Sequence, residues 1–335
     1  MPDKNDPFDA QIDLGEEDLH DLFEPFDPER ISHPRFPEPG KRPPIILAHG
    51  IARPDYLLDT IFSNLKIPLT DFSLVSDRFH YFRGIASYLR KYGFEVYHGR
   101  VSFAADVATR ARDLRREIME IMEKTGHQKV HIIAHSMGGL DARYMIVHEN
   151  MAGRVATLTT VGTPHRGTTI ADFAVEFGLE RIISTLRALI SFEGISSCTT
   201  RATRDFNREA RDAEVHNDVI YQTYASKQTL EKTFLPFQIS WKIIQEREGE
   251  NDGLVGFKSQ MWNKRLVASD GASKRIRQNR FPILADHMDQ IGWWNLNEIH
   301  KAGWWNLAAM RRKAKYETLI KNIYLKIARE VYTLM

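Results

Sequence analysis

Cysteine is almost absent from this 335-residue chain, which contains only Cys198. A single cysteine cannot form an internal disulfide, so a fold held together by disulfides is excluded. No apolar run approaches the roughly 20 residues that a membrane-spanning helix needs, and any lipid contact is expected to be peripheral. The first residues, Met1 to Lys4, lack the basic and apolar regions of a secretory signal. These absences predict a cytoplasmic protein.

Low-complexity tracts are also absent, and the bulk composition is that of a globular protein. Hydrophobic residues make up 42% of the chain and aromatic residues 10%. That content is enough to bury a sizeable core without disulfides or metal. The length suits one large α/β domain that carries an insertion.

Charge is distributed unevenly along the chain. Residues 1–30 contain eleven carboxylates against Lys4 and Arg30, a net charge of −9, so the overall charge of +2 leaves +11 on the remainder. Five prolines follow this acidic stretch, at positions 34, 37, 39, 43 and 44. We predict an extended or disordered arm over residues 1–42, before a folded domain over residues 43–335. The arm either stays solvated or folds back on the basic remainder of the chain. Alternatively, that basic remainder could bind an anionic surface.

Beyond the arm, short β-prone runs alternate with helical patterns. The predicted strands are residues 45–48, 94–97, 130–134, 157–161 and 219–224, and the predicted helices are residues 81–92, 105–124, 140–149 and 316–334. This rhythm predicts an α/β fold with a mostly parallel central sheet and helices on both faces. Apolar residues at helical spacing, without a clear strand, predict an inserted helical cap over about residues 169–215.

The segment Ala134-His135-Ser136-Met137-Gly138-Gly139 lies between a predicted strand and a predicted helix. This is the pattern of a nucleophile elbow, in which a serine occupies a strained turn that demands small neighbours. Ala134 and Gly138 meet that demand. The alternative is an ordinary turn with a capping serine. Ser136 is therefore predicted to be a nucleophile.

A serine hydroxyl needs a histidine to take its proton and a carboxylate to orient that histidine. In elbow-containing folds the acid precedes the histidine, and both follow the serine. Asp252, on an Asn-Asp-Gly turn at an expected strand end, and His287 fit this order. Asp252 could instead only form a turn, and His287 could be a core histidine. The fallback bases are His300 and His165, and the fallback acids are Asp205 and Asp289.

The negative charge that develops on a substrate carbonyl needs two prearranged donors. One is expected from the backbone N–H of Met137, directly after the nucleophile. The loop after the first strand should supply the other, and we choose the N–H of Ile51. Three neighbours of these groups, His49, Gly50 and His135, are predicted to contact substrate.

One short sequence occurs twice: residues 292–296 and 303–307 both read Gly-Trp-Trp-Asn-Leu. If the intervening segment is helical, eleven residues span about three turns and align the tryptophans on one face. Such a stripe could pack in the core or border an acyl-binding site. Trp293 is the candidate substrate contact.

Together these segments resemble the bacterial triacylglycerol lipases and related esterases of the α/β-hydrolase superfamily. The similarity covers roughly residues 44–295, including the Val161 to Thr168 segment with its Gly-Thr-Pro-His-Arg-Gly sequence. It implies Ser136 as nucleophile, Asp252 as acid, His287 as base, and the amides of Ile51 and Met137 as oxyanion donors. Many such lipases bind calcium, and Asp289 is a candidate ligand. Because a second carboxylate is not evident and calcium needs six to eight oxygens, we predict no metal and no cofactor.

The resemblance implies hydrolysis of carboxylic esters with an apolar acyl chain, from a small-molecule or lipid ester. The same groups would also serve a thioesterase, an amidase or a polyester hydrolase. A non-catalytic binding protein would require a defective triad, and none is evident. The basic residues are not interleaved with aromatics, so nucleic acid is not an expected partner. Nothing in the sequence requires a protein partner.

Overall fold

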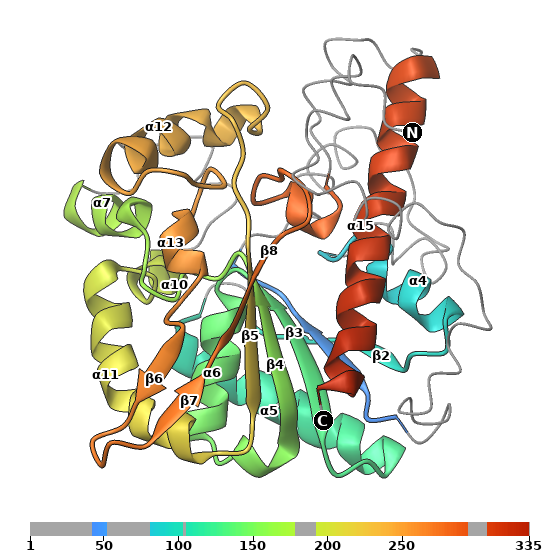
Figure 1. Ribbon diagram of the computed structural model, residues 1–335, viewed down its shortest axis with the longest axis vertical. Helices are drawn as coiled ribbons and strands as arrows, with labels where there is room; N and C mark the ends of the chain where they lie inside the picture. Colours follow the sequence, from blue (N-terminus) through green and yellow to red (C-terminus); the bar gives the residue numbers. More distant parts are fainter. Residues whose placement is uncertain (1–41, 52–80, 103–104, 178–191, 294–306, 335) are drawn as a thin grey trace.

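The structure, a computed structural model, describes residues 42–51, 81–102, 105–177, 192–293 and 307–334. Its centre is a six-stranded sheet of order β2-β1-β3-β4-β5-β8. The strands are β2 (Val96–His98), β1 (Ile45–Ala48), β3 (Val130–His135), β4 (Val155–Val161), β5 (Ile220–Ala225) and β8 (Arg277–Arg280). All neighbouring pairs are parallel. The predicted parallel sheet is confirmed, and the carboxyl ends of its strands lie along one edge (Figure 1).

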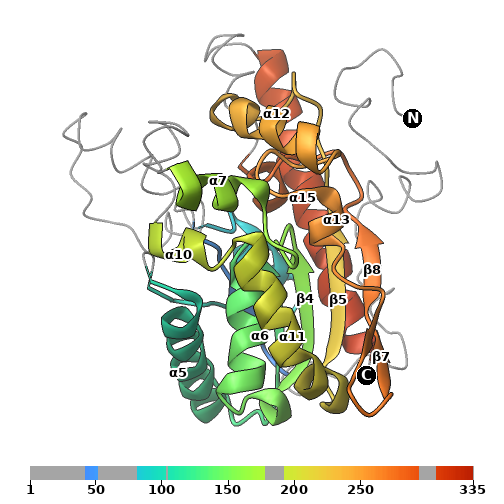
Figure 2. The ribbon, with the colours of Figure 1, turned by 90° about the vertical axis from the view of Figure 1, so that its left-hand side faces the viewer.

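Helices cover both faces of this sheet, because its central strands carry apolar side chains on both sides. In β1, Ile45 and Leu47 belong to one buried cluster, and Ile46 and Ala48 belong to another. The first cluster packs under α4 (Ile85–Lys91) and α15 (Leu307–Thr333). The second packs under α5 (Val107–Thr125) and α6 (Gly138–His148), as Figures 1 and 2 show. The α/β fold class is therefore confirmed.

Local signals set the ends of α5. The side chain of Asp106 accepts a hydrogen bond from the Thr109 N–H at 2.7 Å, which caps the first turn. Gly126 follows the last turn with a φ of 73°, a conformation that glycine adopts without a steric penalty. This helix therefore matches the prediction for residues 105–124 to within two residues at its start and one at its end.

The segment expected to form the cap divides into two parts. Helices α7 (Thr169–Phe177) and α10 (Phe192–Ser196) contact each other above the carboxyl ends of the strands. Helix α11 (Thr200–His216) instead lies beside α6 on the flank of the sheet (Figure 2). Arg143 of α6 donates to Glu214 of α11 at 2.7 Å, and both side chains are buried. Including α11 in a cap was wrong, because this buried pair holds it in the helical layer.

Several elements after β5 were not predicted. They include the short helices η4 (Leu235–Phe237), α12 (Gln238–Arg247), α13 (Phe257–Gln260) and η5 (Asp289–Ile291), and an antiparallel hairpin of β6 (Arg265–Val267) and β7 (Ser273–Arg275). A last short helix, η3 (Ala152–Arg154), precedes β4. Helix α12 packs against α7 at the same end of the sheet as the carboxyl ends of the strands.

Two expectations concern the chain outside this body. The acidic arm of residues 1–42 lies outside the described residues, apart from Arg42. Among the helices of the described residues, none is both long enough and apolar enough to cross a lipid bilayer.

His131, in the middle of β3, makes the stability of this core depend on pH. Its Nδ1 atom lies 2.9 Å from Thr157 Oγ1, and its ring packs 4.5 Å from the ring of Tyr332. Burial lowers the pKa of the His131 imidazole to about 3. Below pH 6.5 the unfolded chain takes up a proton that the folded chain does not. The free energy of unfolding should therefore fall by about 1.4 kcal/mol per pH unit from this group, or about 3 kcal/mol at pH 4.5.

Urea denaturation at pH 7 and pH 4.5 measures this loss, and His131→Gln should remove the part due to His131. The matched control is His216→Gln. His216 is exposed, and its hydrogen bonds to the Asp212 carbonyl and the Asp270 carboxylate raise its pKa. That control should not lessen the loss of stability in acid. An unchanged pH dependence in His131→Gln would contradict the prediction.

Candidate active site

Ser136 occupies the turn between β3 and α6, and its backbone has a φ of 57°. This conformation is rare for a residue with a side chain, and such strain is typical of a nucleophile elbow. A side-chain carbon at Gly138 would lie 2.6 Å from the Ala48 carbonyl oxygen, and one at Gly139 would lie 2.2 Å from Thr163 Oγ1. The requirement for small residues thus arises from the close approach of β1 and of the loop after β4.

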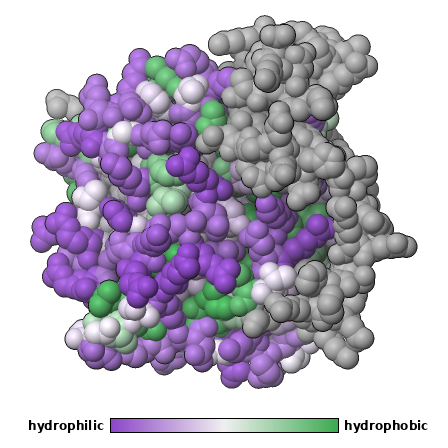
Figure 3. Space-filling view, viewed as in Figure 1, coloured by the Kyte–Doolittle hydropathy of each residue, from purple (hydrophilic) through white to green (hydrophobic). Residues whose placement is uncertain are grey.

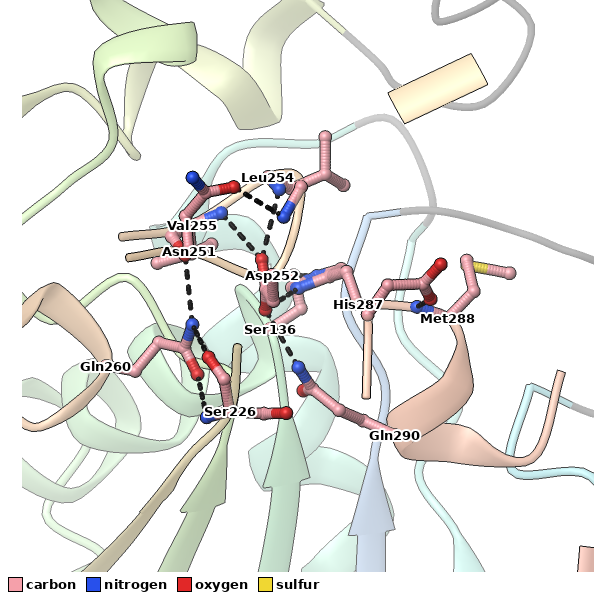
Figure 4. Close-up of polar contacts among 12 residues, drawn as sticks. Ser136, Ser226, Asn251, Asp252, Leu254, Val255, Gln260, His287, Met288 and Gln290 are labelled. Carbon is pink, nitrogen blue, oxygen red and sulfur yellow. Dashed lines mark hydrogen bonds and ion pairs between the residues drawn. The ribbon is translucent and has the colours of Figure 1, made fainter. Parts of the chain in front are cut away.

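Ser136, His287 and Asp252 form a continuous hydrogen-bonded series. His287 Nε2 lies 2.8 Å from Ser136 Oγ, and His287 Nδ1 lies 2.8 Å from Asp252 Oδ2. Figure 4 shows the three residues together at the end of the strands. With a proton on Nδ1, the imidazole donates to the carboxylate and presents Nε2 to the serine hydroxyl. The geometry is that of a nucleophile, a base and an orienting acid.

The turn that carries Asp252 holds its carboxylate firmly. Asp252 Oδ1 accepts from the N–H groups of Leu254 at 3.0 Å and Val255 at 2.8 Å. Gly253 completes this turn with a φ of 96°. The Asp252 carbonyl also accepts from the His287 N–H at 2.9 Å. The predicted tight turn is present, although it follows α12 and not a strand.

The loop after β1 lies directly against the nucleophile. A side-chain carbon at Gly50 would lie 2.6 Å from Ser136 Cβ, so only glycine fits there. Buried Arg110 holds this loop by donating to the carbonyls of His49 at 2.8 Å and Gly50 at 3.2 Å. The Met137 N–H belongs to the first turn of α6, where N–H groups lack an intrahelical acceptor. The two expected oxyanion amides thus come from segments on either side of Ser136.

Arg110 is itself paired with Asp141 of α6, through contacts of 2.9 Å from Nε and 2.8 Å from Nη2. Burial raises the pKa of the Asp141 carboxyl to about 6, and the Arg110 guanidinium opposes this rise. The carboxyl is therefore ionised at neutral pH and balances the buried cation. This pair was not predicted, because an arginine within a charged amphipathic helix gives no sign that it is buried.

Ser136 and His287 border a narrow, mainly apolar cleft of about 60 Å³. The other lining residues are Ile51, Pro164, Thr168, Ile170, Ala171, Ile195, Cys198, Leu254 and Val255. Burial raises the pKa of the Cys198 thiol to about 12, so this residue stays protonated and is a poor competing nucleophile. The cleft suits an apolar group held beside the serine.

The structure separates the remaining candidates from this cleft. His135 is fully buried and Trp293 is 8% exposed, and neither lines the cleft. Trp293 donates from Nε1 to the Tyr81 carbonyl at 2.9 Å and packs within the core, so its contact with substrate stays a prediction that this cleft does not support. The His49 side chain bonds to the Gly50 carbonyl at 2.8 Å. The other tryptophans of the repeat lie outside the described residues.

Of the fallback bases and acids, His165 and Asp205 make other contacts in the described part of the chain. His165 is stacked on Trp262 at 4.5 Å, and burial lowers its pKa well below the usual value. Asp205 is exposed and pairs with Arg208 at 3.1 Å. His300 lies outside the described residues.

Asp289 was the candidate calcium ligand, and its surroundings do not fit such a site. The Asp289 Oδ2 atom accepts from the Asp286 N–H at 3.3 Å. Both carboxylate oxygens of Asp286 accept backbone N–H groups, from Met288, Asp289 and Phe234. In the described part of the chain, no group of three or more His, Cys, Asp or Glu side chains could hold a metal ion.

Two polar residues behind the triad were also missed. Gln290 donates to Asp252 Oδ2 at 2.8 Å, and Tyr81 Oη lies 2.7 Å from His135 Nδ1. The proximity of Gln290 to His287 in the sequence could have suggested the first. No sequence pattern points to Tyr81.

Comparisons with known proteins identify the chain as an ester hydrolase of the lipase and esterase class. Residues 105–188 match a family described as a PGAP1-like alpha/beta domain. Triacylglycerol lipase 2 of Saccharomyces cerevisiae is 30% identical over 259 residues, which cover 74% of this chain and 72% of the relative. The chain therefore belongs to the lipase family of α/β-hydrolases that contains this relative.

Other similar proteins agree with that assignment. A triacylglycerol lipase of Pseudarthrobacter phenanthrenivorans is 36% identical over 135 residues, 39% of this chain and 36% of the relative. Among solved structures, the metagenomic carboxyl esterase MGS0156 is 16% identical with a TM-score of 0.59, covering 88% of this chain and 76% of its own. Bacillus licheniformis lipase BlEst2 is 19% identical with a TM-score of 0.55, covering 79% and 91%. These two structures share the fold.

Proposed function

We propose that this hydrolase cleaves carboxylic esters with an apolar acyl chain through an acyl-enzyme formed on Ser136. The observation that supports this proposal is the series of 2.8 Å contacts from Ser136 through His287 to Asp252, at the side of an apolar cleft. A hydroxyl next to a neutral, oriented imidazole can lose its proton as it attacks.

The reaction follows from these positions. Ser136 Oγ attacks the ester carbonyl carbon while His287 Nε2 takes the hydroxyl proton, and the N–H groups of Ile51 and Met137 stabilise the resulting oxyanion. The carbon–oxygen bond to the alcohol then breaks, and His287 returns the proton to the departing alcohol. Water, activated by the same imidazole, attacks the acyl-enzyme, and the acid leaves with Ser136 restored.

A fluorophosphonate probe and a series of p-nitrophenyl esters from two to sixteen carbons test this proposal. We expect covalent labelling at Ser136, found by peptide mass analysis, and higher kcat/KM for esters with apolar chains than for the acetate. Matched thioester and anilide substrates should be cleaved more slowly. Folded protein that is not labelled would indicate a binding protein, and faster cleavage of a thioester or anilide would indicate a different hydrolase.

We further propose that the substrate is a lipid ester met at a lipid surface. Four large apolar side chains are exposed at the cleft end of the sheet: Val175 and Phe177 on α7, Leu235 on η4 and Ile239 on α12. On the same helix α7, Ile170 and Ala171 line the cleft. The face in Figure 3 is mainly hydrophilic, with one apolar area at its upper end, over α12, and others in its lower half. Several relatives are named triacylglycerol lipases, which agrees with this proposal.

Changing Leu235 and Ile239 together to glutamine should lower activity on emulsified long-chain triacylglycerol by about tenfold, since each apolar side chain contributes part of its transfer free energy at a lipid surface. Activity on p-nitrophenyl acetate in solution should stay unchanged. Val267→Gln is the control, because Val267 is also an exposed apolar residue but lies on β6. Equal losses on both substrates, or an equal loss in the control, would oppose a lipid-facing role.

A cytoplasmic location remains a prediction from the sequence.

A further inference from the structure

The carboxylate of Asp252 receives a second side-chain donor besides His287. Gln290 Nε2 donates to Asp252 Oδ2 at 2.8 Å, the same oxygen that accepts from His287 Nδ1 at 2.8 Å (Figure 4). Asp252 and Gln290 are both fully buried. A buried carboxylate needs such donors, because it has lost its hydration.

The orientation of the Gln290 amide fixes the protons further along this series. Because its nitrogen faces Asp252, its Oε1 atom faces His135 Nε2 at 3.1 Å and can only accept. His135 Nε2 therefore carries a proton, and His135 Nδ1 accepts from Tyr81 Oη at 2.7 Å. Burial, with the nearby His287, lowers the pKa of His135 well below its usual value, so the ring is neutral. The Tyr81 hydroxyl, the His135 Nε2–H group and the Gln290 amide thus each donate to one acceptor in the series.

The far end of the series reaches the oxyanion loop. The Tyr81 hydroxyl lies against the backbone of Gly50. Gly50 directly precedes Ile51, and a side-chain carbon at Gly50 would lie 2.8 Å from Tyr81 Oη. The hydrogen bonds from Asp252 to Tyr81, continued by the contact of Tyr81 with Gly50, therefore connect the carboxylate that orients His287 to the loop beside Ser136.

The surrounding chain makes room for this series. Gly162, in the loop after β4, has a φ of 60°, and a side-chain carbon there would lie 2.2 Å from Gln290 Oε1. The Tyr81 carbonyl accepts from Trp293 Nε1 at 2.9 Å, which fixes the backbone of Tyr81. Buried polar groups in a core are often no more stabilising than apolar ones of the same volume. A purely structural need therefore explains this arrangement poorly.

We propose that Tyr81, His135 and Gln290 are positioning residues for the hydrolysis reaction. They hold the loop after β1, which carries the expected oxyanion amide of Ile51, in a fixed position relative to the Asp252 carboxylate. This inference rests on the proposed catalytic roles of Ser136, His287 and Asp252. Gln290 keeps Asp252 Oδ2 directed at His287, and Tyr81 keeps Gly50 and the following amide directed at the substrate carbonyl.

The test compares Gln290→Met and Tyr81→Phe with two matched controls. Gln222→Met removes a buried amide that donates to Thr159 Oγ1 at 2.7 Å, and Tyr221→Phe removes a buried hydroxyl that accepts from Asn217 at 2.9 Å. Both controls lie in β5 and do not contact the triad. We expect Gln290→Met to lower kcat by about tenfold to a hundredfold, and Tyr81→Phe by about threefold to tenfold, with KM unchanged. The controls should keep wild-type kcat.

The double variant separates positioning from independent structural damage. If one series joins the two residues, the combined loss of kcat should be clearly smaller than the product of the single losses. Tyr81→Phe removes only one oxygen atom, so its kcat can still be measured on folded protein if Gln290→Met unfolds. The inference would be overturned by wild-type kcat in Tyr81→Phe, or by equal losses of kcat in the controls. It would also be overturned by an effect on KM alone, or by losses of kcat that multiply fully in the double variant. An unlabelled Ser136 in folded wild-type protein would instead overturn the proposed function.

Discussion

Replacing Ser136 with alanine should lower kcat by about 10⁶ and leave the protein folded. In the proposed reaction the hydroxyl oxygen of Ser136 is the attacking atom, and without it neither His287 nor the oxyanion amides have an intermediate to stabilise. The fold should persist, because alanine keeps Cβ and meets the same backbone strain at a φ of 57° as serine does. Steady-state hydrolysis of a p-nitrophenyl ester and urea denaturation measure the two effects.

Ser102→Ala is the control for this substitution. The Ser102 hydroxyl bonds to Asp113 Oδ2 at 2.5 Å on the exposed surface. Its loss should not change kcat. His287→Ala should be about as severe as Ser136→Ala, and the double variant should be little worse, because the two residues act in one step. More than a few per cent of wild-type activity in Ser136→Ala would exclude this serine as the nucleophile.

The central sheet could be predicted because its strands are buried on both faces. β1 was found from a continuous apolar run, and β3 and β5 were found from runs rich in apolar, aromatic and β-branched residues. β8 was missed, since its sequence Arg-Gln-Asn-Arg carries no apolar residue. It forms at the edge of the sheet and pairs only with β5 in the described part of the chain, so no core demands an apolar pattern there.

The cap shows the limit of helical periodicity. The sequence of α11 has apolar residues at helical spacing, and the same spacing serves a helix above the active site or one beside the sheet. The pairing of Glu214 with Arg143 decides between them, and the partners lie 71 residues apart. A contact of this kind cannot be read from a local pattern.

In the active site, too, local features could be predicted from the sequence and long-range contacts could not. The elbow at Ser136 and the Asn-Asp-Gly turn at Asp252 are local structures with local sequence requirements, so both could be predicted. Gln290, His135 and Tyr81 meet through contacts between distant segments. His135 was instead assigned to substrate on its position before Ser136, a position that the fold turns toward the core.

The structure also determines what an amide would do at position 252. Asp252 Oδ1 accepts two backbone N–H groups, so the oxygen of an asparagine would take that place and its NH₂ would face His287 and Gln290. Three donors would then converge where one carboxylate oxygen now accepts two. His287 would have to move its proton to Nε2, which removes the acceptor for the Ser136 proton.

Asp252→Asn should therefore lower kcat by about 10⁴ at neutral pH, the loss that triads show when the imidazole has the wrong tautomer. The side chain keeps its shape and its bonds to the turn, so stability should change much less than activity. Asp289→Asn and Asp205→Asn are the matched controls: Asp289 is buried near His287 but bonds to the Asp286 backbone, and Asp205 is exposed. Both should retain kcat within about threefold, because neither side chain bonds to the imidazole. Near wild-type turnover in Asp252→Asn, with loss in either control, would assign the orienting acid to the other carboxylate.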